Sequence, residues 1–331
     1  MPSTLHARRG FTLVELLVAV VVLTIVLGGI YNLLLNTQRV SRAQAERMDM
    51  QSNMRAGTLI VPSELREVGY DTTYLPAAGG LAGSLSTVQS DILAMGPTSI
   101  RFRAVRRSGI ICAVGATTVT VFGQWTTVGW NASGYRAPSV NDDLTIFVEG
   151  GTTTGADDRW ITRDIIGITT AGVNCPALGA IGAGPGTQFT MLGFAGVNDP
   201  VTSAQITVGS PVRLNEIMEY SLYTDADGRN YLGAQSISAG GGRQPVLGPL
   251  NPNNGFNLTY LDLNGNQVAC AAPCNGGFAS ADMQARRRVR TVGVSVVAIS
   301  DENVSPAGTG ANQQLLDSVV TLVTLRNAVH R

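Results

Sequence analysis

The most apolar part of the chain lies close to its beginning. Residues 16–35 form a run of twenty residues without a charged side chain, which as an α-helix would be about 30 Å long. This length matches the hydrocarbon core of a bilayer, so the pattern predicts a membrane-spanning helix. His6, Arg8 and Arg9 precede the run without any acidic residue. The positive-inside rule therefore predicts a cytoplasmic start and places the C-terminal bulk of the chain on the other side.

A second pattern follows in residues 36–70. Apolar residues recur there at alternating steps of three and four, which predicts an amphipathic helix with one narrow apolar stripe. The stripe comprises Val40, Ala43, Met50, Met54 and Val61, with Arg47 and Gly57 at its two remaining positions. Pro62 then interrupts the pattern and is expected to kink or break the helix. Ser63 is expected to cap a short helix that starts again after it.

From residue 71 onwards the chain changes to short alternating or β-branched runs separated by turn residues. This texture predicts one antiparallel β-rich domain, 71–331. Strands are expected at 99–105, 116–122, 144–150, 159–165, 212–224, 256–263, 288–300 and 316–327. Runs rich in Gly, Pro or Asn are expected to be surface loops, at 79–87, 172–187, 236–255 and 301–314. The predicted fold class is α+β, with a long N-terminal helix packed on an antiparallel β-rich head.

The composition argues against most classes of enzyme. The 23 basic and 23 acidic residues balance, every basic residue is arginine, and the two histidines, His6 and His330, lie near the ends. Ser/His/Asp triads, Cys/His pairs, His-ligated zinc sites and Ser/Lys dyads need side chains that the body of the chain lacks. Paired carboxylates, as in glycosidases, stay open on chemical grounds, but no clustering of acidic residues points to a pair. We therefore expect neither enzymatic activity nor a cofactor.

One carboxylate lies within the apolar N-terminal region. Glu15, in "RGFTLVELL", would cost at least about 2.5 to 3.5 kcal/mol in hydrocarbon, so it needs a partner or a purpose. A cleavable signal peptide would have a shorter apolar core and an A-x-A-like site, which "GGIYNLLLNTQRV" does not provide. A plain anchor explains neither Glu15 nor the junction of Gly10 with Phe11.

Gly10, Phe11 and Glu15, followed by a long apolar helix, resemble the processing signal of the type IV pilin and pseudopilin family. The resemblance implies that a prepilin peptidase cleaves after Gly10 and that the new amine of Phe11 is N-methylated. It divides the region before the head into three segments. These are a cytoplasmic leader (1–10), a transmembrane and assembly helix (11–35) and a periplasmic amphipathic helix (36–70).

The resemblance also implies a role for Glu15. In a filament, the amine of one subunit's Phe11 would meet the Glu15 carboxylate of a neighbouring subunit, so that each charge offsets the desolvation of the other. A local interpretation is that the helix macrodipole favours a carboxylate here by up to about 1 kcal/mol, which needs no neighbour.

The chain further resembles the W-type minor pilins. Arg66, Glu67, Gly69 and Tyr70 match a stretch that closes the first element in those proteins, and residues 325–327 match the end of their last strand. This implies a subunit of the priming or tip complex of a type IV pilus, held in the inner membrane with its head in the periplasm and then in the surface pilus. Other minor and major pilins, the prepilin peptidase and the inner-membrane assembly platform would be its partners. A J-type pseudopilin of type II secretion and a membrane-anchored adhesin or binding domain are the alternatives.

The four cysteines all follow the apolar helix, in a compartment expected to oxidise thiols. The segment "CAAPC" is short and contains a proline, so a Cys270–Cys274 disulfide is plausible and leaves Cys112–Cys175 to join two distant segments. Loop-entropy arithmetic gives about 2 kcal/mol for the first and about 4 kcal/mol for the second. Ligation of zinc is the alternative to this pairing.

Three further patterns have both a structural and a functional interpretation. The runs 225–230 and 262–266 space oxygen side chains as calcium loops do, but Asp-Gly and Asn-Gly favour hairpin turns, which we expect. The run "RRRVR" (286–290) could contact DNA phosphates. Without nearby stacking aromatics we expect a solvated strand entrance or a subunit contact and no nucleic-acid binding. The aromatic residues could form an adhesive patch, although packing roles are expected, for Trp125, Trp130, Tyr135 and Trp160.

Overall fold

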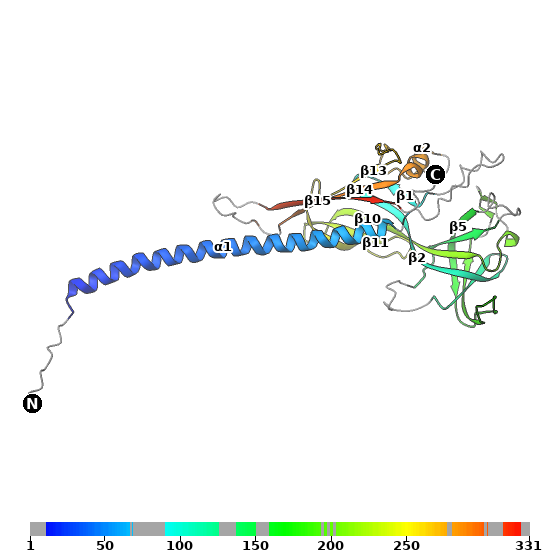
Figure 1. Cartoon of the computed structure of the whole chain (residues 1–331), viewed down its shortest axis with the longest axis horizontal. Helices are drawn as coiled ribbons and strands as arrows, with labels where there is room; N and C mark the ends of the chain where they lie inside the picture. The colour runs from blue at the N-terminus through cyan, green and yellow to red at the C-terminus, as the bar shows by residue number, and fades with distance from the viewer. Residues whose placement is uncertain are drawn as a thin grey trace, which may run out of the picture. The chain divides into compact units, whose positions relative to one another are not determined.

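The computed structural model describes residues 11–66, 68, 90–125, 137–149, 159–192, 195–196, 199–200, 203–276, 280–300, 303 and 314–325. The chain divides into two compact units. One consists of Met1–Ser52 with Ile299–Leu316, and the other of Asn53–Ala298 with Asp317–Arg331. Helix α1 (Leu13–Arg66) is continuous and contributes to both units (Figure 1).

The strands of the described residues form one large antiparallel sheet and one small two-stranded sheet. The large sheet contains β1 (Ile92–Met95), β2 (Ser99–Val114), β3 (Thr118–Phe122), β4 (Asp143–Val148), β5 (Arg159–Thr169), β6 (Asn174–Cys175), β7 (Gly184–Met191), β10 (Pro211–Thr224), β11 (Asn230–Ser236), β12 (Gln244–Leu250), β13 (Phe256–Leu261), β14 (Thr291–Ile299) and β15 (Leu316–Thr324). The remaining elements are β8 (Ala195–Gly196), β9 (Asp199–Pro200), the 3₁₀ helix η2 (Ser203–Gln205) and α2 (Ala281–Arg288). The expected α+β class is confirmed.

Six strands of the large sheet close into a ring. Strand β2 pairs with β3, the order continues through β7, β5, β4 and β10, and β10 pairs with β2 again. Closure gives each of these strands a partner on both sides and so limits exposed edges. The ring encloses a hydrophobic core, here called the ring core, whose fully buried side chains include Ile111, Leu144, Ile146, Ile161 and Phe189.

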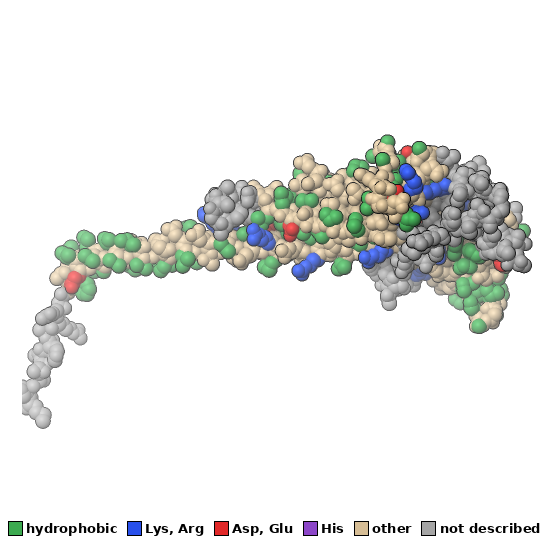
Figure 2. Space-filling view, turned by 45° about the horizontal axis from the view of Figure 1, so that its top comes forward, with side chains coloured by type: hydrophobic (Ala, Val, Ile, Leu, Met, Phe, Trp, Pro, Cys, Tyr) green, Lys and Arg blue, Asp and Glu red, His purple; other side chains and the backbone are tan. Residues whose placement is uncertain are grey.

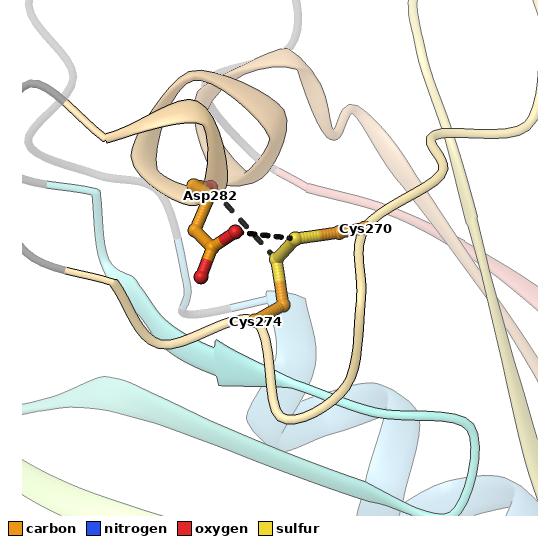
Figure 3. A group of neighbouring side chains, drawn as sticks. All are labelled: Cys270, Cys274 and Asp282. Atoms are coloured by element: carbon orange, nitrogen blue, oxygen red, sulfur yellow. Dashed lines mark hydrogen bonds between the residues drawn. A yellow bond between two sulfur atoms is a disulfide. The ribbon is translucent and has the colours of Figure 1, made fainter.

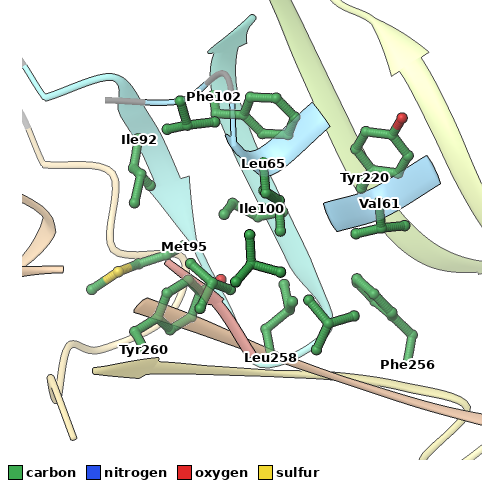
Figure 4. Packing of buried hydrophobic residues seen from close by; sticks show 14 of the residues in the cluster. Val61, Leu65, Ile92, Met95, Ile100, Phe102, Tyr220, Phe256, Leu258 and Tyr260 are labelled. Atoms are coloured by element: carbon green, nitrogen blue, oxygen red, sulfur yellow. The ribbon is translucent and has the colours of Figure 1, made fainter. Parts of the chain in front are cut away.

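A second core, here called the helix core, lies where the last turns of α1 pack on the sheet. Val61 and Leu65 of α1 lie among apolar side chains of β2, β10 and β13 (Figure 4). Gly57, one turn earlier, faces β12, where a Cβ atom would collide with Cδ2 of Leu247. The absence of a side chain therefore lets this turn of the helix approach the strand closely.

The narrow apolar stripe predicted for residues 36–70 is present over most of its length. Met54 and Val61 belong to the helix core, and Met50 packs with Leu315 and Ala43 in the first unit. Val40, at the start of the stripe, is exposed.

A kink or break of the helix is expected at Pro62, with a new start after Ser63. The expected break is wrong. The helix continues through Pro62 to Arg66, and the Ser63 hydroxyl donates a hydrogen bond to the Ile60 carbonyl inside it. A proline inside a helix costs about 3 kcal/mol. Burying Val61 and Leu65 contributes about 1.5 to 3 kcal/mol each, and this tertiary packing outweighs the local preference.

Several boundaries predicted in the sheet also differ. The expected loop 172–187 contains β6 and the start of β7, and the expected loop 236–255 contains β12. Strand β12 pairs with β11 through two irregularities in register, and such irregular strands tolerate the Gly and Pro residues that suggested a loop. The expected strand 288–300 begins only at Thr291, because the residues before it end helix α2.

Strands β2 and β10 pass through both cores, and buried polar side chains occupy the positions between them. Arg106 lies at an irregularity in their pairing. Its Nε donates to Glu216 Oε2 over 2.7 Å, and its Nη1 donates to Glu64 Oε2 of α1 over 2.9 Å. Burial alone would lower the pKa of Arg106, but the charges of the two glutamates raise it above its ordinary value. This ion triad therefore joins the last turns of α1 to the middle of the sheet.

Two disulfides are present among the described residues. Cys112 of β2 is joined to Cys175 of β6, and Cys270 is joined to Cys274 in the loop before α2. This is the pairing that the spacing predicted.

Replacement of Arg106 by Met should destabilise the protein by about 3 kcal/mol, since it removes a positive charge that is hydrogen-bonded to the buried Glu216 carboxylate. Urea unfolding of the full chain in detergent, followed by tryptophan fluorescence, measures the loss. The matched control is Arg101→Met, which removes a half-exposed partner of Glu219 and should cost about 1 kcal/mol or less. Equal losses in the two variants would contradict a special role for the triad.

The disulfides predict that the full chain, purified without reductant and then unfolded, contains no thiol that reacts with a maleimide. After reduction all four cysteines should react. Mass spectrometry counts the labels, and labelling of two or more cysteines before reduction would refute the pairing.

Candidate functional site

The N-terminal part of α1 presents apolar side chains on all sides. Leu13, Ile25 and Leu33 are each at least two-thirds exposed, and an 18-residue window of this helix has none of its residues buried. Figure 2 shows hydrophobic side chains along this part of the helix. A helix that is apolar all round needs apolar surroundings. By length and composition, α1 can cross a membrane.

Thr12 and Glu15 form the start of this helix. The backbone N–H of Glu15 donates to Thr12 Oγ1 over 3.3 Å, while the backbone N–H of Thr12 donates to Glu15 Oε2 over 3.0 Å. The Thr12 hydroxyl also donates to Glu15 Oε2, over 3.1 Å. These reciprocal bonds are a capping box, which satisfies two backbone donors that the first turn would otherwise leave unpaired.

The capping box orients Glu15 but does not neutralise it. Both hydrogen bonds from Thr12 fall on Oε2, and within the part of the chain that the structure describes Glu15 forms no ion pair. The carboxylate lies on the same helix face as Phe11, Val18, Ala19 and Val22. A charge in such an apolar setting is costly unless it has a partner.

Thr12 is the residue that the sequence reasoning missed. The spacing Thr-x-x-Glu before an apolar run is a known signature of a helix start and could have identified it. Phe11 precedes the first helical turn and is exposed. The backbone just after the predicted cleavage position is therefore outside the helix, where a protease can reach it.

Some predicted residues lie outside the described part of the chain. These are Gly10, Glu67, Gly69, Tyr70, Trp130, Tyr135, Arg326 and Asn327. The cleavage, methylation and assembly roles of Gly10, Phe11 and Glu15 stay predictions.

The two candidate calcium loops are turns. Residues 225–230 connect β10 to β11, and Gly228 takes the left-handed conformation that a tight turn requires. The pKa of Asp227 is lowered because the backbone N–H of Arg229 and the Tyr231 hydroxyl donate to its carboxylate. In 262–266, Asp262 likewise accepts hydrogen bonds from backbone N–H groups of its own turn. The carboxylates of Asp227 and Asp262 therefore accept hydrogen bonds from their own turns.

The expectation of a solvated strand entrance at 286–290 is wrong for Arg286, and the alternative of a subunit contact stays a prediction. Arg286 lies in the last turn of α2 and is only 3% exposed. Its Nη1 and Nη2 donate to the carbonyls of Cys274 and Gly276, over 2.6 and 2.7 Å, and burial lowers its pKa. Arg290 donates to the carbonyls of Arg287 and Val289. Two of these arginines therefore bind the protein's own backbone.

Two of the candidate adhesive aromatics have packing roles, as expected. Trp125 is buried in the ring core, where it meets Phe189 edge-on with 5.4 Å between ring centroids. Trp160 packs edge-on against Phe147, and the guanidinium of Arg213 lies 4.4 Å from its ring centroid. Both rings are thus in contact with neighbouring side chains.

The comparisons with known proteins bear on the N-terminus alone. The family described as "prokaryotic N-terminal methylation motif" matches residues 5–31. No curated protein and no solved structure matches the chain. The matched residues contain Gly10, Phe11 and Glu15, and the match supports a type IV pilin-like or pseudopilin protein that is processed by a prepilin peptidase.

Proposed function

We propose that this chain is a minor pilin of the W type, a structural and assembly subunit in the priming or tip complex of a type IV pilus. The observation that carries the proposal is an apolar helix that starts directly after the matched processing junction, with a Glu15 that is capped and has no ion-pair partner among the described residues. In this proposal Glu15 accepts the N-methylated amine of a neighbouring subunit's Phe11. The chain acts by subunit contacts and not by catalysis.

The rest of the proposal follows from the helix and the head. The basic N-terminus would stay in the cytoplasm and the head would lie in the periplasm until the subunit enters the pilus. Other minor and major pilins and the inner-membrane assembly platform would be the partners. A J-type pseudopilin would share the signal and the helix, and the length of 331 residues favours the pilus because heads of the J type are usually smaller.

Gly10→Val should block processing, because a β-branched side chain obstructs close approach of the peptidase to the backbone at the cut. The precursor should then accumulate in the membrane, and mass spectrometry of the N-terminus should find neither cleavage nor methylation of Phe11. The matched control is Ala7→Val, the same kind of change away from the junction, which should be processed normally. Mature Gly10→Val protein at wild-type levels would show that residues 1–10 are not a leader.

Glu15→Gln should abolish assembly while processing continues. Glutamine can still complete a capping box, so the variant removes the charge and keeps the helix start. The neighbour's amine would then lose its counter-charge in apolar surroundings, at a cost of about 3 kcal/mol or more. The measurement is recovery of the processed variant in sheared filaments and with other minor pilins.

The control for the cap is Thr12→Ala, which retains the charge and should cost about 1 kcal/mol of local stability. Its assembly should be nearly normal. Wild-type incorporation of Glu15→Gln, or an equal defect in Thr12→Ala, would show that the intersubunit ion pair is not the purpose of this carboxylate. An N-terminus without methylated Phe11 in the wild type would favour a plain membrane anchor.

A further inference from the structure

One cluster of side chains outside the N-terminal site has chemistry that the proposed assembly role does not use. Cys270 and Cys274 close a short loop, and Asp282 from the first turn of α2 faces their sulfur atoms (Figure 3). The Asp282 carboxylate Oδ1 lies 3.4 Å from Cys270 Sγ. The two sulfurs and this carboxylate lie within 4.8 Å of one another.

The spacing fits the ligand shell of a tetrahedral thiophilic cation. With metal–sulfur and metal–oxygen bonds of about 2.3 and 2.1 Å, two ligand atoms of a zinc tetrahedron lie about 3.5 Å apart. The Asp282 oxygen and the Cys270 sulfur already have this separation. Once the disulfide is reduced, the sulfurs need to move apart to about 3.8 Å to complete the same shell. Cys270 is only half-buried, so a water molecule can reach the fourth position.

The loop is held in place by bonds that do not depend on the disulfide. The backbone N–H of Gly276 donates to Asp282 Oδ2 over 2.9 Å, which leaves Oδ1 directed at the sulfurs. Arg286 holds the carbonyls of Cys274 and Gly276. Such outer hydrogen bonds orient the ligands in metal sites.

The charges also balance. Two thiolates and one carboxylate carry three negative charges, and a divalent cation together with the buried Arg286 guanidinium carries three positive charges. A half-buried site with no net charge avoids most of the cost of taking ions out of water. Arg286 thus faces one net negative charge in both states, from the Asp282 carboxylate in the oxidised state and from the three ligands with the cation in the metal-bound state.

We propose that Cys270, Cys274 and Asp282 form a binding site for one Zn²⁺ ion when the disulfide is reduced. An external dithiol supplies two electrons and two protons, so that the Cys270–Cys274 bond breaks, two thiols form and the dithiol becomes a disulfide. Zn²⁺ then displaces both thiol protons to solvent as two Zn–S bonds form. The disulfide and the metal are alternative closures of one loop, and each keeps residues 270–276 docked on α2.

The test uses the full chain in detergent. The protein is reduced with dithiothreitol, freed of it by desalting without oxygen, and titrated with Zn²⁺ against a chromophoric chelator and with Cd²⁺ by thiolate charge-transfer absorption. The reduced wild type should bind one ion per chain and show the charge-transfer band. The unreduced protein should show neither.

Variants separate this site from the other cysteines. The double variant Cys112→Ser with Cys175→Ser should keep the binding, and the double variant Cys270→Ser with Cys274→Ser should abolish it. Asp282→Asn keeps an oxygen acceptor for Gly276 and should weaken Zn²⁺ binding at least about tenfold, since outer ligands alone contribute about 10- to 100-fold.

Three results would overturn the proposal: no bound ion in the reduced wild type, unchanged affinity in Asp282→Asn, or loss of binding in the variant of Cys112 and Cys175. None of these results bears on whether the chain assembles into a filament. The site and the proposed pilin role therefore stand or fall separately.

Discussion

The structure depends on one helix that has to satisfy two different surroundings. At its start, α1 exposes apolar side chains in every direction, as at Leu13, and only an apolar medium or other apolar helices can cover them. At its end, the same helix buries one stripe that includes Val61 and Leu65 and leaves the opposite face to solvent. Both stretches belong to one helix, which runs from Leu13 to Arg66.

The attachment of that helix to the sheet combines nonspecific and specific contacts. Apolar burial in the helix core supplies most of the free energy, since each fully buried side chain contributes about 1.5 to 3 kcal/mol. The ion triad of Glu64, Arg106 and Glu216 adds a directional contact that fixes where the last turns lie. Gly57 allows close approach to Leu247 at another point. Strands β2 and β10 contribute side chains to both cores. The ion triad therefore contacts strands that also belong to the ring.

Glu15 has a local role in the structure, and the proposed function gives it an intermolecular role as well. Its hydrogen bonds with Thr12 account for the start of the helix without any neighbour. They do not cancel its charge, and a capping glutamine would serve the helix equally well. The choice of a carboxylate in an apolar region is therefore the part that local structure leaves unexplained, and in the proposed filament an amine from another subunit would account for it.

The sequence by itself determined the features that depend on neighbours along the chain. The apolar run, the processing motif, the stripe from Ala43 to Val61, both turns and the cysteine pairing could be read from spacing and residue type, because each arises within a few residues or from a small set of combinations.

Tertiary structure decided the rest. Pro62 stays helical because Val61 and Leu65 are buried, β12 is a strand because β11 is there to pair with it, and Arg286 is buried because α2 packs on the disulfide loop. The closure of six strands into a ring and the meeting of Arg106 with Glu64 depend on residues far apart in the chain. Local propensities of about 1 to 3 kcal/mol are comparable to the free energy gained by burying a single side chain, so long-range packing can override them. The pattern of residues along the chain does not contain this long-range packing.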